Sequence, residues 1–138
     1  ISIYARPYRD GTSEDYVSRR GIIGRYRQLK PEAFIQRIGQ STPDVKDIAD
    51  LARSGDKAAV RVFRDTGIFL AEILHGIIRD NGFEVLLLGG QIAKSAGLFL
   101  PELTSGLDDL PAPPLIWPAE AIDEAPLLGV ARACWQIS

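Results

Sequence analysis

The sequence contains no methionine, and its only cysteine and only histidine are Cys134 and His75. A single cysteine cannot form a disulfide within the chain or supply a multi-cysteine zinc site, and it fits a reducing compartment such as the cytoplasm. Because the chain starts at Ile1 and has no methionine, we expect it to be part of a longer protein.

The chain also lacks an excess of basic residues, since its formal net charge is −2. This charge argues against a broad electrostatic attraction to nucleic acid or to acidic membranes. No apolar run approaches the roughly 18 residues of a membrane span, and no charged-then-apolar leader is present. With 138 residues, of which 46% are hydrophobic and 25% charged, the composition predicts one soluble, cytoplasmic domain with a real core.

Helical spacing of apolar residues covers most of the chain. The longest pattern begins at Asp56 and ends at Asn81-Gly82. Inside it, Gly67 and Gly76 each weaken a helix by up to ~1 kcal/mol relative to alanine, so we expect close packing against a neighbouring element there. Shorter helices are predicted from Ser13 to Tyr26, over Phe34–Ile38, after a cap at Thr42 or Asp44, over Ile92–Leu107 and over Ile122–Trp135. In the helix over Ile92–Leu107, Pro101 lies in the first turns or restarts the helix.

Strand-like segments alternate with these helices. They are Ile1–Tyr8, Val85–Leu88 and Leu115–Trp117. The order strand, helices, strand, helix, strand, helix predicts an α/β fold rather than a helical bundle.

The segment from Val85 to Leu88 is followed at once by Gly89-Gly90 and then by a helical pattern. A short apolar run that ends in two glycines is typical of a buried parallel strand. The free N–H groups where such a strand passes into a helix favour phosphate or another anion. Since neither the P-loop pattern nor the GxGxxG spacing is present, a nucleotide site and an ordinary turn without a ligand are both compatible with the residues.

Other residues that could have a chemical role have simpler interpretations. Arg19 and Arg20 could hold a phosphate, although a solvated helix face is the favoured interpretation. A packing or surface role is favoured for His75, which lies within the long helical pattern. Trp117 and Trp135 are interpreted as core or interface anchors rather than as sugar-stacking platforms.

Four blocks of sequence resemble, in the same order, the ROK sugar kinases and repressors of the actin-like ATPase superfamily. They are Glu14–Gly21 (Glu-Asp-Tyr-Val-Ser-Arg-Arg-Gly), Asp50–Asp56 (Asp-Leu-Ala-Arg-Ser-Gly-Asp), Leu87–Gln91 (Leu-Leu-Gly-Gly-Gln) and Ala125–Ala131 (Ala-Pro-Leu-Leu-Gly-Val-Ala). The resemblance implies that residues 1–138 form a single lobe, the C-terminal part of a two-lobed protein. Its implied fold is actin-like (ribonuclease H-like), with a mixed sheet flanked by helices.

The same resemblance implies transfer of the γ-phosphate of ATP to a hexose hydroxyl, usually with Mg²⁺. The glutamate that matches Glu14 contacts sugar hydroxyls in this family, and a carboxylate can accept hydrogen bonds from two of them. Compensation of the helix dipole is the alternative role of Glu14. Gly89 and Gly90 are expected to lie against the nucleotide, while Gln91 contacts the nucleotide or caps the helix. The family's Asp-Gly-Gly-Thr segment and general base lie in the other half, so we expect no catalytic residue here and no activity from this lobe alone.

Many members of the family hold a structural zinc ion through a cysteine-rich block just before this glutamate. The corresponding stretch Tyr8–Glu14 has no cysteine, so we expect no zinc. An alternative function is the sugar-sensing lobe of a ROK-type transcriptional repressor, without direct contact between this lobe and nucleic acid. A third is a non-enzymatic interaction module. A homodimer formed through this lobe is compatible with all three.

Overall fold

The computed structural model describes residues 7–35, 41–82, 85–88, 94–118 and 134–137. Helices dominate these residues, and the strands between them are short. The elements are β1 (Pro7–Tyr8), β2 (Gly11–Thr12), α1 (Ser13–Val17), α2 (Arg19–Leu29), the 3₁₀ turn η1 (Pro31–Phe34), α3 (Val45–Arg53), α4 (Lys57–Asn81), β3 (Val85–Leu88), the 3₁₀ turn η2 (Ala96–Leu98), α6 (Leu100–Leu107), β4 (Leu115–Pro118) and β5 (Cys134–Ile137). No helix in the described ranges is long and apolar enough to cross a membrane.

The long helix α4 has both of its ends defined by local sequence. At its start, the Asp56 carboxylate accepts hydrogen bonds from the backbone N–H groups of Ala58 at 3.0 Å and Ala59 at 3.2 Å. At its end, Gly82 adopts the left-handed conformation with φ of 67°, which glycine reaches at no steric cost, and its N–H bonds to the carbonyl of Ile78. The helix predicted between Asp56 and Asn81 is confirmed.

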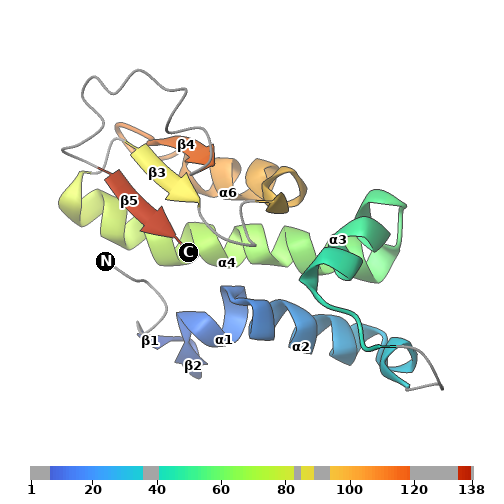
Figure 1. Ribbon diagram of the computed structural model, residues 1–138. Coiled ribbons are helices and arrows are strands. Elements are labelled where there is room, and N and C mark those ends of the chain that lie inside the picture. Colours follow the sequence, from blue (N-terminus) through green and yellow to red (C-terminus); the bar gives the residue numbers. More distant parts are fainter. Residues whose placement is uncertain (1–6, 36–40, 83–84, 89–93, 119–133, 138) are drawn as a thin grey trace.

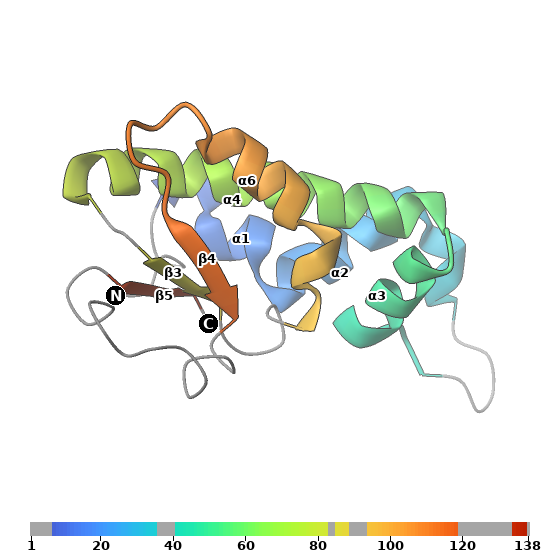
Figure 2. The same ribbon diagram turned by 90° about the horizontal axis from the view of Figure 1, so that it is seen from above.

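The remaining helices surround α4. Helices α1 and α2 lie along one side of it, α6 lies along another, and α3 packs near its N-terminal end (Figures 1 and 2). Apolar side chains from α2, α3, α4 and α6 meet in one core, in which each fully buried side chain contributes roughly 1.5–3 kcal/mol of hydrophobic free energy. The largest fully buried ones are Tyr26, Phe63, Phe99, Ile22, Ile48, Leu70, Leu74, Leu103 and Leu107.

Two glycines allow α4 and α6 to approach each other closely. A Cβ atom at Gly67 of α4 would lie 2.5 Å from the carbonyl oxygen of Phe99, and one at Gly106 of α6 would collide with the Cβ of Ala71. The close packing predicted at Gly67 is therefore confirmed. At Gly76, no atom in the described part of the chain lies within 4 Å of such a Cβ. Close packing against the described residues was therefore wrongly predicted at Gly76.

Three parallel strands form a small sheet, in which β3 lies between β4 and β5. The register pairs Leu88 with both Pro118 and Ile137, so the carboxyl ends of all three strands share one edge. The mixed sheet expected from the resemblance is not seen in the described ranges. The antiparallel pairing there belongs to the separate two-residue hairpin of β1 and β2.

Several predicted element boundaries are wrong, because tertiary contacts override local periodicity. Of the last helix, predicted over Ile122–Trp135, residues 122–133 lie outside the described ranges, and Cys134–Ile137 is a strand paired with β3. The predicted helix over Ile92–Leu107 is divided by η2, and α6 begins at Leu100 with Pro101 in its first turn, so the proline restarts the helix.

Near the N-terminus, the helix predicted from Ser13 to Tyr26 is divided at Ser18, whose Oγ accepts a hydrogen bond from the N–H of Gly21 at 3.4 Å and caps α2. Of the helix predicted over Phe34–Ile38, the structure describes Phe34, the last residue of the 3₁₀ turn η1, and Ile35, and residues 36–38 lie outside the described ranges. Of the strand predicted over Ile1–Tyr8, the structure describes Pro7–Tyr8.

Candidate functional site

The start of α1, where Glu14 lies, is fixed by a local network. The Asp15 carboxylate accepts hydrogen bonds from the Thr12 N–H at 2.8 Å and from the Thr12 hydroxyl at 3.2 Å. These bonds lower the pKa of Asp15, with Thr12 N–H as the main cause, and Arg20 at 2.7 Å acts in the same direction. Glu14 is the second residue of α1, as the sequence predicts, but its side chain lies outside the described set. The network therefore fixes the backbone on either side of Glu14.

A polar depression of about 490 Å³ lies beside this turn. Its volume is within the range of roughly 300–1,000 Å³ that is usual for small-molecule sites. Carboxylate, guanidinium, amide and phenol groups line it, so both donors and acceptors for hydroxyl groups are present. Its lining includes Gly11, three residues before Glu14, and Asp15, the residue after it. The lining residues are Asp10, Gly11, Asp15, Tyr16, Arg20, Gly21, Gly24, Arg25 and Gln28.

Arg25 forms the inner wall of this depression and was not singled out from the sequence. Its guanidinium donates to the carbonyl of Tyr16 at 2.7 Å, the carbonyl of Val62 at 2.9 Å and the hydroxyl of Thr66 at 2.6 Å. Burial lowers its pKa to about 10, which still leaves the group charged at neutral pH. A basic residue on a helix gives no local signal of such burial, because two of its three partners lie on α4.

The neighbouring basic residues have ordinary surface roles. Arg19 pairs with Asp44 at 2.8 Å, Arg20 pairs with Asp15, and both arginine side chains are largely exposed. These pairs agree with the solvated helix face favoured from the sequence. Both guanidinium groups bind carboxylates, so the pairs do not support a phosphate-binding role. Gly21 is needed at this point, because a Cβ there would lie 2.6 Å from the carbonyl oxygen of Asp15.

The predicted nucleotide-binding residues Gly89, Gly90 and Gln91 lie outside the described residues. The strand that leads into them is described, and it is the parallel, central strand β3, as predicted. Gly89 follows the carboxyl end of β3, which shares its edge with the carboxyl ends of β4 and β5. In open parallel sheets, ligands bind beyond this edge.

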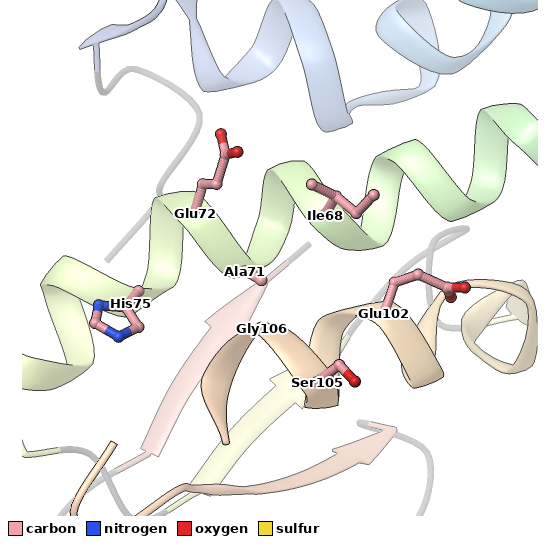
Figure 3. Close-up of a pocket in the computed structure, with 7 residues that line it drawn as sticks. All are labelled: Ile68, Ala71, Glu72, His75, Glu102, Ser105 and Gly106. Atoms are coloured by element: carbon pink, nitrogen blue, oxygen red, sulfur yellow. The ribbon is translucent and has the colours of Figure 1, made fainter. Parts of the chain in front are cut away.

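A second depression, of about 420 Å³, lies between α4 and α6 (Figure 3). Its lining is largely apolar and consists of Ile68, Ala71, Glu72, His75, Glu102, Ser105 and Gly106. His75 has a partner here, because its Nε2 lies 3.0 Å from Oδ1 of Asp109. This pair supports the surface role favoured for His75. Trp117 and Trp135 lie in β4 and β5, and their side chains are outside the described set.

The described residues contain no group of three or more His, Cys, Asp or Glu side chains that could hold a metal ion. In particular, the described residues of the β1–β2 hairpin, where no zinc is expected from the sequence, offer no such set. Structural zinc sites need four ligands, usually cysteine and histidine, so these residues do not fit one. Magnesium needs fewer protein ligands than structural zinc, since it is commonly bound by one or two carboxylates together with substrate phosphates.

Comparison with known proteins gives a consistent picture of the fold. No family model and no curated protein sequence matches the chain significantly. Among solved structures, a protein from Cytophaga hutchinsonii provisionally described as a sugar kinase matches 98% of this chain with a TM-score of 0.65 and 20% identity. A ROK family glucokinase from Streptomyces griseus, solved with glucose and AMPPNP, matches 82% of the chain with a TM-score of 0.67 and 20% identity. A ROK hexokinase from Thermus thermophilus matches 80% with a TM-score of 0.55 and 20% identity.

The chain spans 42%, 41% and 37% of the lengths of these three proteins, respectively. The structural neighbours are thus sugar kinases, including ROK family members, and the chain is similar to part of each. At this level of identity the likeness establishes the fold, which agrees with the resemblance seen in the four sequence blocks.

Proposed function

We propose that this chain is the C-terminal lobe of a two-lobed, ATP-dependent hexose kinase of the ROK type. The observation that supports this most strongly is the similarity of 98% of the chain to 42% of a structure described as a sugar kinase. A related glucokinase was solved with glucose and AMPPNP, so a sugar and an adenine nucleotide are the ligands to test first. Phosphoryl transfer depends mainly on positioning and on charge stabilisation in a closed cleft, so one lobe alone is expected to be inactive.

Within this proposal, Glu14 accepts hydrogen bonds from the sugar. An ionised carboxylate has two oxygens and no donor, so it can accept from two adjacent hydroxyl groups. The anchoring of Thr12 by Asp15 supports this role, because it fixes the turn from which Glu14 projects. The polar depression beside that turn supports it as well.

The nucleotide is proposed to lie beyond the carboxyl end of β3. Gly89 and Gly90 have no side chains to obstruct a phosphate, so the backbone N–H groups can approach it closely. Gln91 contacts the nucleotide or caps the following helix. Magnesium, when bound with ATP, would neutralise charge on the phosphates, and the general base is assigned to the N-terminal lobe.

Glucose binding tests the assignment of Glu14. We expect glucose to shift the amide NMR resonances of Thr12 and Asp15 in the 138-residue chain, and we expect Glu14→Gln, which keeps one acceptor oxygen in place of two, to reduce these shifts. Glu32→Gln, at an exposed position of η1, is the matched control and should retain them. Equal shifts in the Glu14→Gln variant would contradict the assignment.

Phosphorylation assays test whether this lobe alone can catalyse the reaction. The 138-residue chain should not phosphorylate glucose with ATP and Mg²⁺, whereas a longer protein that contains both lobes should. Glucose-dependent ATP turnover by the chain alone would refute the single-lobe proposal. The alternative, a sugar-sensing repressor lobe, predicts a helix-turn-helix segment in the upstream coding sequence instead of an Asp-Gly-Gly-Thr turn. Both alternatives are compatible with a homodimer, which stays a prediction.

A further inference from the structure

The hairpin that precedes α1 is too small to be stable by itself. Strands β1 and β2 have two residues each, and isolated two-stranded hairpins are marginal in water even when they are longer. In addition, the turn places Arg9 at a positive φ of 52°, a conformation that residues other than glycine seldom adopt. Contacts with the rest of the molecule must therefore hold the hairpin in place.

Three polar side chains provide one such contact. The Tyr8 hydroxyl donates a hydrogen bond to Oε2 of Glu72 on α4. Arg9 contacts both of these side chains, since its Nη2 lies 3.2 Å from the same oxygen of Glu72 and its Nε donates to the Tyr8 hydroxyl at 3.1 Å. Glu72 also lines the depression between α4 and α6, and Figure 3 shows its carboxylate pointing away from α6. Burial and the bond to Glu72 raise the pKa of Tyr8 to about 12, so its hydroxyl stays a donor at physiological pH.

Aromatic rings extend this contact to α1. Tyr8, Tyr16 of α1 and Phe69 of α4 meet edge to face, with centroids 5.0 Å apart for Tyr8 and Tyr16, 6.0 Å for Tyr8 and Phe69, and 5.4 Å for Tyr16 and Phe69. The guanidinium of Arg9 lies 5.0 Å from the Phe69 centroid and covers the group. Edge-to-face pairs and stacked guanidinium groups are favourable beyond the area that they bury.

We propose that this hairpin clamp, defined as Tyr8, Arg9 and Glu72 seated on Tyr16 and Phe69, fixes the β1–β2 hairpin and the first turn of α1 without a metal ion. Glu72 is then a positioning residue for Glu14, through Tyr8 and the hairpin. The clamp joins α4 to the segment 7–12, and that segment joins directly to the turn that contains Glu14. The clamp itself is independent of the proposed function, whereas the positioning of Glu14 for a sugar depends on it.

Hydrogen–deuterium exchange of the 138-residue chain tests the clamp. Tyr8→Phe, which keeps the ring, and Glu72→Ala should each speed the exchange of the Gly11 and Thr12 amides roughly three- to tenfold, as expected for loss of a solvent-exposed hydrogen bond. The double variant should be little faster than either single one, because both remove the same interaction. Glu102→Ala is the matched control, since Glu102 lies on α6 and pairs with Arg64.

Adding a metal chelator to the wild-type chain should leave these exchange rates unchanged. Acceleration of Thr12 exchange by the chelator, or normal exchange in Glu72→Ala, would overturn the metal-free clamp. Both readouts are independent of any ligand, so they decide the clamp even if the chain binds no sugar.

Glucose titration tests the positioning role. Glu72→Ala should weaken glucose binding several-fold with an unchanged melting temperature, and Glu72→Gln, which keeps an acceptor for Tyr8, should restore most of the affinity. Faster hairpin exchange with unchanged glucose affinity would overturn the positioning role. If the wild-type chain shows no glucose response while the exchange results hold, the proposed function and the positioning role fail together and the clamp stands.

Discussion

The guanidinium of Arg25 lies 4.9 Å from the centroid of the Phe69 ring, and this contact joins α2 to α4. The same side chain donates to the backbone carbonyl of Tyr16, so one residue connects α1, α2 and α4. Arg9 approaches the same Phe69 ring at 5.0 Å. Phe69 therefore contacts two guanidinium groups, one from the hairpin and one from α2.

Replacing Arg25 should destabilise the protein more than its place on a helix surface suggests. Arg25→Met removes three hydrogen bonds from a largely buried charged donor, and we expect the free energy of unfolding to fall by about 1–3 kcal/mol. Arg25→Lys should cost a similar amount, because an ammonium group cannot reproduce the planar fork of donors. Urea unfolding followed by circular dichroism measures both changes.

Arg61→Lys provides the control for this experiment. Arg61 lies on α4 with a largely exposed side chain and a single long ion pair to Asp65, at 3.8 Å. Its substitution should change stability by less than about 0.5 kcal/mol. If Arg25→Met proves as stable as the wild type, the cost of burying the guanidinium equals the benefit of its bonds, and Arg25 does not stabilise the junction.

Asp56 should link the stability of the protein to pH. Its carboxylate caps α4 and also accepts hydrogen bonds from Lys30 at 2.9 Å and from the Tyr26 hydroxyl at 3.0 Å. The bond to Lys30 is the main cause that lowers the pKa of Asp56 below its ordinary value. A lowered folded-state pKa means that the stabilisation is complete above the unfolded value, about 3.9, and is lost as the pH falls through the folded value.

We expect Asp56→Ala to lower the free energy of unfolding by about 1–2 kcal/mol at pH 7, as for other lost N-caps. The difference from the wild type should shrink as the pH falls below about 4, because the wild-type carboxylate is then protonated. Denaturant unfolding at a series of pH values checks both statements. Asp80→Ala is the control, since Asp80 is exposed and pairs with the adjacent Arg79. A pH-independent difference would mean that the charge of Asp56 contributes nothing.

The ends of α4 were the part of the fold that the sequence predicted best, because capping is local. Asp56 and Gly82 bound α4, as expected from residue type and position alone. Of the two candidate caps Thr42 and Asp44, the structure uses Asp44, which begins α3 with a capping box that includes Asp47. The strand at Cys134–Ile137 was missed, because only its pairing with β3, far away in sequence, makes it a strand.

The residues of the candidate site also fall into those that local patterns predict and those that depend on long-range contacts. Placing Glu14 in the first turn of a helix, and Gly89 after a parallel strand, required only local patterns and a family resemblance. Arg25 and Glu72 could not be found in this way, because two of the three partners of Arg25 lie 37 and 41 residues away along the chain, and the partners of Glu72 lie 63 and 64 residues away. Such contacts exist only after α4 has packed against the N-terminal elements.

The two glycines within α4 should respond oppositely to the same substitution. A Cβ at Gly67 would lie 2.5 Å from the carbonyl oxygen of Phe99 and 2.9 Å from the Cβ of Glu102, so Gly67→Ala must push α6 away from α4. Overpacking of this kind typically costs about 1–3 kcal/mol. At Gly76 no described atom lies within 4 Å, and alanine in a helix interior is favoured over glycine by roughly 0.5–1 kcal/mol.

We therefore expect Gly67→Ala to lower the melting temperature and Gly76→Ala to raise it, as measured by thermal unfolding of the two variants side by side. Each variant serves as the control for the other, because the substitution, the helix and the intrinsic helix propensity are the same. The sign of the difference depends only on what surrounds each position. If both variants melted above the wild type, α6 would have room to yield at Gly67, and the close contact between α4 and α6 would not be a constraint on the fold.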